Sequence, residues 1–352
     1  MVSKYLKRIT LIALAVVIAF AFSAPVVNAA KPIKMRIIYA YPDTTQHGKN
    51  MIKWKELAEK YTDGRLSVSL FPNASICPTN REMATVLSRG AEASYLMCGS
   101  AQCVDKAEAI WSVPFLFKTK PGDCRHTRAA YTDKRIMGPL EARLEKKGYK
   151  LLGIAQTVDG FFICANNVRP INKYEDFKGL KMRSQGGMFN EFYFSMFGAH
   201  CAVIPGTEVP VALSTGVADG VTTCALHWHD ARWHTKYLTL PFWCALPMLF
   251  VVNLDWWNSL PADIQDTLEN KVMPEVREWS LDEVDRKTIA LLKEVVDPPY
   301  NVTINTLPAS EMKRMEEICQ APAIEKFRKE VGKELADQLI EAARDLTPAD
   351  LK

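Results

Sequence analysis

The chain has 352 residues, of which 48% are hydrophobic and 24% charged, and its formal net charge is +4. This length predicts two domains. Three of the positive charges, Lys4, Lys7 and Arg8, lie in the first thirty residues, which hold no acidic residue, so the remainder carries +1. A near-neutral protein has no electrostatic surface for nucleic acid or an anionic membrane, and we expect neither as a partner.

The N-terminus predicts a secretory signal peptide over residues 1–29. Its basic start is followed by an apolar run from Ile9 to Phe22 and then by small residues that end at Ala29 and Ala30, as at a cleavage site. The apolar run is shorter than the ~20 residues that span a bilayer, which favours a cleaved signal peptide. An uncleaved membrane anchor is the alternative interpretation. We therefore expect an exported, periplasmic protein that is cleaved near Ala29.

Strands alternate with helices along the first part of the chain. The expected elements are a strand at 35–40, a loop at 41–47, a helix ending at Gly64, a strand at 66–70 and a helix from a capping box at 79–82 to Gly90. Repeated strand–helix units favour a parallel sheet with helices on its faces.

The second part continues the α/β pattern and adds long helices. Its expected elements are strands at 151–155 and 161–165, helices at 188–197 and 208–213, two strands joined by a turn within 238–252, a helix at 261–296 and more helix at 310–343. Pro274 lies inside the helix at 261–296, so we expect that helix to kink as it runs along both domains.

Nine cysteines are many for an exported protein, and the number is odd. Disulfides are permitted outside the cytoplasm, and Cys77, Cys98 and Cys103 are the participants we expect. Their connectivity does not follow from the sequence. Small buried apolar residues are the alternative for the others.

Arg183 ends a short apolar strand at an expected domain junction. A guanidinium is planar, permanently charged and able to donate two parallel hydrogen bonds to the two oxygens of a carboxylate. Arg183 is therefore the candidate anchor for an acidic ligand. A structural salt bridge is the alternative interpretation.

Several motifs occur in a fixed order around Arg183. They are Leu70-Phe-Pro-Asn73, Arg81-Glu-Met83, Val113-Pro-Phe-Leu-Phe117, Arg169-Pro-Ile171, Gly179-Leu-Lys-Met-Arg183, Glu208-Val209, Ala212-Leu213, Gly216, Asp219-Gly220 and Asn253-Leu-Asp-Trp-Trp-Asn-Ser-Leu-Pro261. By their order and spacing, the chain resembles the solute-binding proteins of tripartite ATP-independent periplasmic (TRAP) transporters over nearly its whole mature length.

The resemblance implies an α/β fold, the two-lobed clamshell of periplasmic binding proteins, with a long kinked helix along both lobes. We expect lobe I to comprise 30–159 and 248–288, and lobe II 160–247 and 289–352. The resemblance also implies a small organic acid bound between the lobes, with its carboxylate on Arg183, and delivery to a membrane permease. It implies no cofactor.

Three positions depart from the pattern that many family members show. Phe162 stands in a region where a second arginine is common, Thr223 where an asparagine is common, and Gly206 where an aromatic residue is common. Trp228, just beyond Thr223, is a candidate aromatic wall. The site thus loses charge and gains space, which favours a ligand with one acidic group and an apolar or aromatic body. A small dicarboxylate or a sulfonate is the alternative.

Five further residues are candidate ligand contacts. Tyr41 and His47 lie in the loop expected after the first strand, Cys98 and Gly99 lie in a similarly placed loop, and Met188 lies at the start of an expected helix.

The segment His227-Trp-His-Asp-Ala-Arg-Trp-His234 is the one cluster with metal-ligand residue types, but its spacings suit no single element fully. A helix with partly exposed His and Trp side chains near the cleft mouth is favoured, and we expect no metal. The chain has no nucleophile elbow, phosphate-binding Gly-rich loop or zinc-protease motif, so we expect no enzyme. A ligand-sensing module for a receptor is an alternative that the sequence hardly separates from transport.

Overall fold

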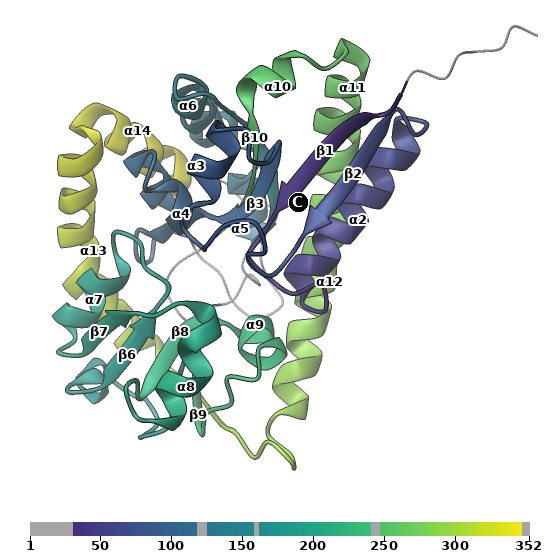
Figure 1. Cartoon of the computed structure of the whole chain (residues 1–352). Helices are drawn as coiled ribbons and strands as arrows, with labels where there is room; N and C mark the ends of the chain where they lie inside the picture. The colour runs from purple at the N-terminus through teal and green to yellow at the C-terminus, as the bar shows by residue number, and fades with distance from the viewer. Residues whose placement is uncertain (1–30, 118–124, 158–161, 241–246, 347–352) are drawn as a thin grey trace, which may run out of the picture. The chain divides into compact units, whose positions relative to one another are not determined.

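The computed structural model describes residues 31–117, 125–157, 162–240 and 247–346, and their strands form two sheets (Figure 1). The signal peptide predicted over 1–29 lies outside these residues. From Lys34 onward the chain packs as one unit, which holds both sheets.

The first sheet has five strands in the order β2-β1-β3-β10-β4. Strands β1 and β3 are parallel, whereas β10 is antiparallel to both β3 and β4. Every residue of β10 is buried, as expected for a strand that has neighbours on both sides and elements on both faces. The strands are β1 (Ile33–Ile38), β2 (Leu66–Phe71), β3 (Ala93–Met97), β4 (Tyr149–Thr157) and β10 (Pro247–Asn253).

The second sheet has six strands in the order β11-β9-β5-β8-β6-β7. Strand β5 is antiparallel to β8 and β9, and β6 is parallel to both β7 and β8. The strands are β5 (Phe162–Asn166), β6 (Lys181–Ser184), β7 (His200–Val203), β8 (Gly220–Cys224), β9 (Tyr237–Leu240) and β11 (Thr303–Thr306).

Helices follow most strands of both sheets. Those after strands of the first sheet are α2 (Gln46–Tyr61), α3 (Glu82–Leu87), α4 (Cys98–Ala101), η1 (Lys106–Ser112), α5 (Arg125–Ala130), α6 (Lys134–Glu145) and α10 (Leu254–Asn258). Those after strands of the second are η2 (Tyr174–Phe177), α7 (Asn190–Met196), η3 (Gly206–Glu208), α8 (Val209–Ser214) and α9 (Ala225–Asp230).

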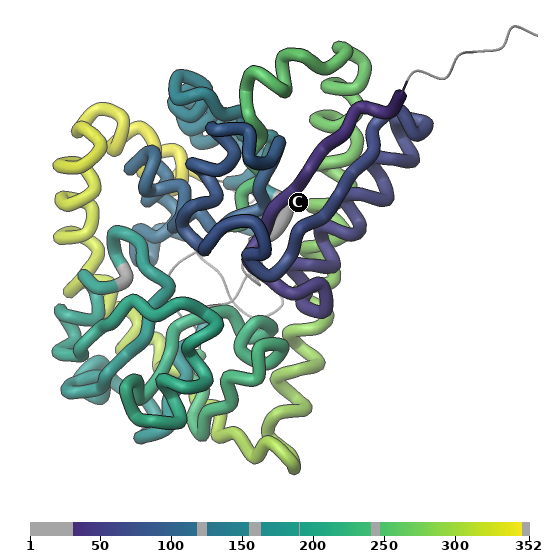
Figure 2. Tube along the Cα trace, viewed as in Figure 1, coloured from purple at the N-terminus to yellow at the C-terminus, as the bar shows by residue number. Residues whose placement is uncertain are grey.

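The long helix expected over 261–296 runs as α11 (Ala262–Thr267), the π-helical turn η4 (Leu268–Val272) and α12 (Met273–Glu294). Pro274 lies in the first turn of α12, where its missing N–H breaks the regular hydrogen-bond ladder next to the π turn. Helix α12 contacts α2 and β4 as well as α9, so one helix touches elements around both sheets (Figure 2). Two further helices, α13 (Ala309–Val331) and α14 (Lys333–Arg344), end the described chain.

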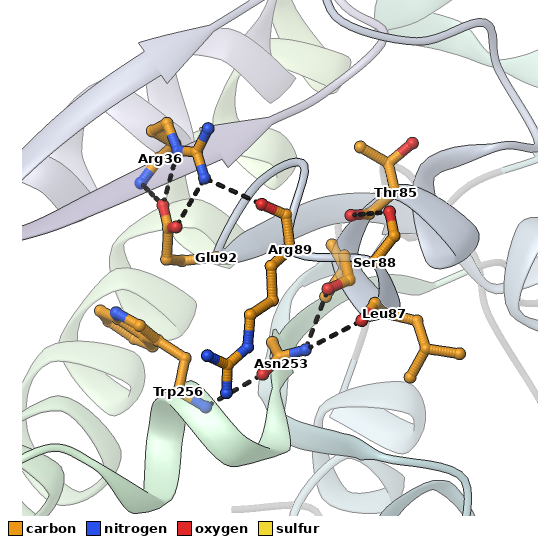
Figure 3. Close-up of polar contacts among 9 residues, drawn as sticks. Arg36, Thr85, Leu87, Ser88, Arg89, Glu92, Asn253 and Trp256 are labelled. Carbon is orange, nitrogen blue, oxygen red and sulfur yellow. Dashed lines mark hydrogen bonds and ion pairs between the residues drawn. The ribbon is translucent and has the colours of Figure 1, made fainter.

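One end of the first sheet is fixed by polar contacts (Figure 3). The Glu92 carboxylate, just before β3, accepts hydrogen bonds from the backbone N of Arg36 in β1 (2.7 Å) and from its guanidinium. The Asn253 side chain, at the end of β10, donates to Val86 O (3.0 Å) and accepts from Trp256 N (2.9 Å). These contacts lie at the N-terminal end of β3, opposite the end after which Cys98 lies.

Three local predictions are wrong. The capping box expected at Thr79 does not form, because α3 begins only at Glu82 and Arg81 makes no side-chain cap. The loop expected at Cys98 and Gly99 is instead the short helix α4. The loop after β1 ends earlier than expected, since Thr45 caps α2 and His47 lies in its first turn.

The disulfide expected among Cys77, Cys98 and Cys103 is absent. Cys77 and Cys103 are free thiols, and any pairing among the three would use at least one of them. Two other cysteines of the chain, Cys124 and Cys244, fall outside the described residues.

A buried carboxyl group in η1 predicts a pH-dependent stability. Glu108 is 0% exposed, its Oε2 accepts a hydrogen bond from Trp111 Nε1 (3.2 Å), and its Oε1 has no partner within the described ranges. Burial raises the pKa of Glu108 to about 8. Between pH ~4.5 and 8 the unfolded state therefore binds fewer protons than the folded state at this group, so its contribution to stability falls as pH rises.

We expect Glu108→Gln to remove the part of the stability loss at rising pH that Glu108 causes. Its free energy of unfolding should match that of the wild type near pH 4.5 and exceed it by on the order of 4 kcal/mol at pH 8. Urea titrations at several pH values measure the difference. Glu325→Gln, at a side chain that is 76% exposed, is the control and should change nothing. A Glu108→Gln variant that is less stable than the wild type at pH 8 would contradict the prediction.

Candidate functional site

The candidate site lies where the carboxyl ends of strands from both sheets meet. Tyr41 follows β1, Cys98 follows β3 and begins α4, Arg183 lies near the end of β6, and Thr223 lies near the end of β8. Because β1 is parallel to β3, and β6 to β8, each pair ends at one edge of its sheet. Carboxyl ends of parallel strands are where α/β proteins commonly bind ligands.

Aromatic rings join these edges. The Tyr41 ring lies 4.2 Å from the His47 ring and 5.4 Å from the His227 ring of α9, measured between centroids. The His227 ring in turn lies 4.8 Å from Trp233. A hydrogen bond joins the same two segments, since the backbone N of Gln46 in α2 donates to Asp230 Oδ2 in α9 (3.3 Å). Residues after β1 and residues after β8 are therefore in direct contact.

Arg183 is buried in this region, with 4% of its surface exposed. Its Nε donates to Ile204 O (2.8 Å), and its guanidinium carbon lies 4.9 Å from the centre of the Trp233 ring. No carboxylate in the described part of the chain forms an ion pair with it. Burial lowers the pKa of Arg183 to about 10, so the group is still charged at neutral pH. A buried, charged guanidinium held by a carbonyl and an aromatic ring is suited to pair with an anion from outside the chain.

The pKa values of Tyr41 and His227 are both shifted beside the charged Arg183. Burial is the main reason why the pKa of Tyr41 is raised, with Cys224 and the Glu82 carboxylate adding to the rise and Arg183 opposing it. Burial, with His47 and Arg183, lowers the pKa of His227 well below its ordinary value. His227 is therefore neutral at pH 7, and its buried Nδ1 has no hydrogen-bond partner among the described residues.

A second contact between the two edges involves α4 and the segment after β6. The backbone N of Met188 donates to Gln102 Oε1 (2.8 Å), and a Cβ built on Gly99 would lie 3.8 Å from Gly186 O. Gly99 thus lies in van der Waals range of the chain three residues after Arg183.

The structure brings together most of the ligand contacts predicted from sequence. Tyr41, His47 and Arg183 are linked by ring contacts or electrostatic interactions, as described above, and Met188, Cys98 and Gly99 lie at the α4 contact. Thr223 is buried in β8, with 6% of its surface exposed. Phe162 pairs with Cys224 across β5 and β8, and its side chain lies outside what the structure describes.

Trp228 and Gly206 are placed differently from the expectation. The Trp228 ring is 0% exposed and packs in the core of the second sheet with residues such as Ile163 and Leu238. A Cβ on Gly206 would lie 3.5 Å from Trp233 Cζ2, so Trp233 borders the space that Gly206 leaves. The aromatic side chain against Arg183 is thus Trp233, which the sequence reading did not single out as a ligand wall.

The His227–His234 segment does not assemble a metal site in the described residues, where no group of three or more His, Cys, Asp or Glu side chains is arranged to hold a metal ion. The segment forms α9 and its C-terminal turn, so the favoured helix is confirmed, but Trp228 and Trp233 are buried and not partly exposed as expected. His229 Nε2 lies 3.2 Å from the Tyr300 hydroxyl, and His227 turns toward Tyr41 instead.

Comparison with known proteins identifies the family. The model of the family described as "Bacterial extracellular solute-binding protein, family 7" matches residues 38–330. The chain belongs to this family. It is 27% identical over 336 residues to the C4-dicarboxylate-binding periplasmic protein DctP of Rhodobacter capsulatus, covering 91% of this chain and 93% of that protein. The predicted resemblance to TRAP solute-binding proteins is confirmed.

Solved structures confirm the fold. The sugar acid binding protein DctPAm of Advenella mimigardefordensis, in complex with galactonate, matches with a TM-score of 0.79 and 22% identity, covering 90% of this chain and 99% of that one. A TRAP periplasmic solute-binding protein of Sulfurospirillum deleyianum, with bound succinate, matches with a TM-score of 0.77 and 22% identity. The match covers 89% of this chain and 99% of that one. The predicted two-lobed α/β architecture is thus correct. No helix among the described residues is long and apolar enough to span a bilayer.

Proposed function

We propose that this protein captures a small organic acid between its two lobes and delivers it to the membrane permease of a TRAP transporter. In this proposal the ligand carboxylate pairs with Arg183. The observation that carries the proposal is the burial of this guanidinium without a carboxylate partner in the described chain. An isolated buried charge is costly, and a ligand carboxylate would offset that cost through paired hydrogen bonds.

The comparisons support the same function. The relatives reported above are named as binding proteins, one for C4-dicarboxylates and one for sugar acids, and the succinate-bound protein is named a TRAP periplasmic solute-binding protein. Export through a signal peptide over 1–29, cleaved near Ala29, is part of the proposal. So are the lobe boundaries, with 30–159 and 248–288 in lobe I and 160–247 and 289–352 in lobe II.

The remaining contacts are assigned within this proposal. Thr223 donates a hydrogen bond to the ligand, Trp233 forms the wall beside Arg183, and Tyr41 and His47 border the site from the first lobe. An apolar or aromatic body of the ligand, inferred from Phe162 and Gly206, stays a prediction.

A thermal-shift screen of the mature protein, refolded to strip bound ligand, tests the proposal. The panel holds mono- and dicarboxylates, aromatic acids, sulfonates and amino acids. A ligand that binds only the folded state raises the apparent melting temperature by mass action. We expect a large shift for one class of carboxylic acid. An absence of any shift across the panel, repeated by calorimetry, would contradict it.

A further inference from the structure

Two polar side chains, one from each sheet's side of the candidate site, have buried atoms without hydrogen-bond partners among the described residues. The Oε2 atom of Glu82 and both amide atoms of Gln185 are buried and find no partner in the described part of the chain. Glu82 has only 4% of its surface exposed. Leaving such groups unsatisfied is costly, so a site with several of them is suited to an occupant that completes their hydrogen bonds.

Glu82 lies on the first-sheet side of the site. It is the first residue of α3, and the residue two positions before it, Asn80, accepts a hydrogen bond from Ser100 Oγ of α4 (3.0 Å). The backbone N–H groups of Asn80 and of Glu82 itself bond to the carboxylate, which opposes the rise in its pKa that burial causes. These bonds leave Oε2 as the unpaired atom.

Gln185 lies on the second-sheet side. It follows Arg183 by two residues and comes directly after β6, which ends at Ser184. Its neighbour Gly186 approaches Gly99, which precedes Ser100 in α4. The first turn of α4 therefore contacts the Gln185 segment at Gly99 and the Glu82 segment at Ser100.

We propose that Glu82 and Gln185 form a second ligand subsite, which takes a hydrogen-bond donor of the ligand, such as a hydroxyl group, and rejects a second carboxylate. The subsite rests on the proposed function, because Arg183 holds the first carboxylate. A hydroxyl donates to Glu82 Oε2 and accepts from Gln185 Nε2, which gives each of these two atoms a partner. A carboxylate in that place either meets the negative charge of Glu82 or has to bring a proton, and both weaken binding.

Straight-chain acids that differ only at the far end test the subsite. The probes are the ω-hydroxy acids of three to six carbons, each with its matched alkanoate and α,ω-diacid, measured by calorimetry at pH 8. We expect the wild-type protein to bind the best-fitting hydroxy acid at least ten-fold more tightly than the matched diacid. Glu82→Gln should bring that ratio down by ten-fold or more, because the amide removes the repulsion while keeping the size.

Two controls separate this inference from the proposed function. Glu317→Gln, at a side chain that is 66% exposed, should leave every affinity unchanged. Arg183→Ala should weaken all three ligand types together. If acids bind through Arg183 but Glu82→Gln leaves the hydroxy-acid to diacid ratio unchanged, or the wild type prefers the diacid at every length, the subsite is wrong and the proposed function stands. If no acid binds, both are wrong.

Discussion

Arg183→Ala is expected to weaken binding of the organic acid by two to three orders of magnitude. Removing one side of a buried, hydrogen-bonded charge pair costs ~2–5 kcal/mol, and ~1.4 kcal/mol corresponds to a ten-fold change in affinity. The structure adds that Trp233 and Ile204 O hold the guanidinium in place before the ligand arrives. Titration of the ligand-stripped variant with the acid found in the screen measures the loss.

The same substitution should leave the ligand-free protein as stable as the wild type, or make it more stable. Arg183 is 4% exposed and has no acidic partner in the described chain, so its removal relieves a desolvated charge. A residue with a purely structural role would show the opposite, with a lower melting temperature and little change in affinity. That result would contradict the anchor role.

Arg183→Lys is the informative companion variant. It keeps the positive charge but replaces the planar fork by a point charge, and it weakens the stacking on Trp233. We expect an affinity between those of the wild type and Arg183→Ala. Arg286→Ala, at a side chain that is 66% exposed and pairs with Glu283, is the control and should bind as the wild type does.

The sequence predicted the position of Arg183 because that position depends on local features. A short apolar strand, the residues that end it and the order of the surrounding motifs are all visible in the chain, and β6 ends at Ser184. The long helix was predicted for the same reason, since apolar periodicity and Pro274 are local signals. The α/β class followed from the alternation of such elements.

Trp233 could not be placed in this way because its position depends on a turn. Helix α9 ends at Asp230, Arg232 takes a positive φ of 56°, and Trp233 N bonds back to Trp228 O (2.9 Å). This reversal carries the Trp233 ring onto Arg183, although both tryptophans belong to the same buried cluster. A residue-type pattern with two tryptophans five apart does not reveal which of them contacts Arg183.

Glu82 was missed for a related reason. The pattern Thr79–Glu82 predicted a capping box, in which the glutamate would bond back to the first residue of the motif. Instead Asn80 takes a positive φ of 71°, the helix starts at Glu82, and the carboxylate is buried. The signal that finds it is burial together with an unpaired oxygen, and only a three-dimensional structure supplies both.

Gly48→Ala should destabilise the fold and weaken ligand binding together. Gly48 lies in the first turn of α2, and a Cβ there would lie 2.8 Å from the carbonyl carbon of Asp43 and closer still to Asp43 Cα and Pro42 O. Because these are backbone atoms, the segment between Tyr41 and the helix has to shift. Overpacking of this kind costs about 2–4 kcal/mol of stability.

The shift would also reach the site. Tyr41 precedes the displaced segment and His47 precedes Gly48, and their rings are 4.2 Å apart in the contact that borders Arg183. We therefore expect a melting temperature lower by roughly 5 °C or more and a ligand affinity at least several-fold weaker. Gly138→Ala is the matched control, since a Cβ at this helical position meets nothing within 4 Å. It should raise stability by about 0.5–1 kcal/mol, because alanine is the better helix former, and leave affinity unchanged. Equal effects of the two substitutions on melting temperature and affinity would show that the close packing of α2 against the Tyr41 loop does not position the site.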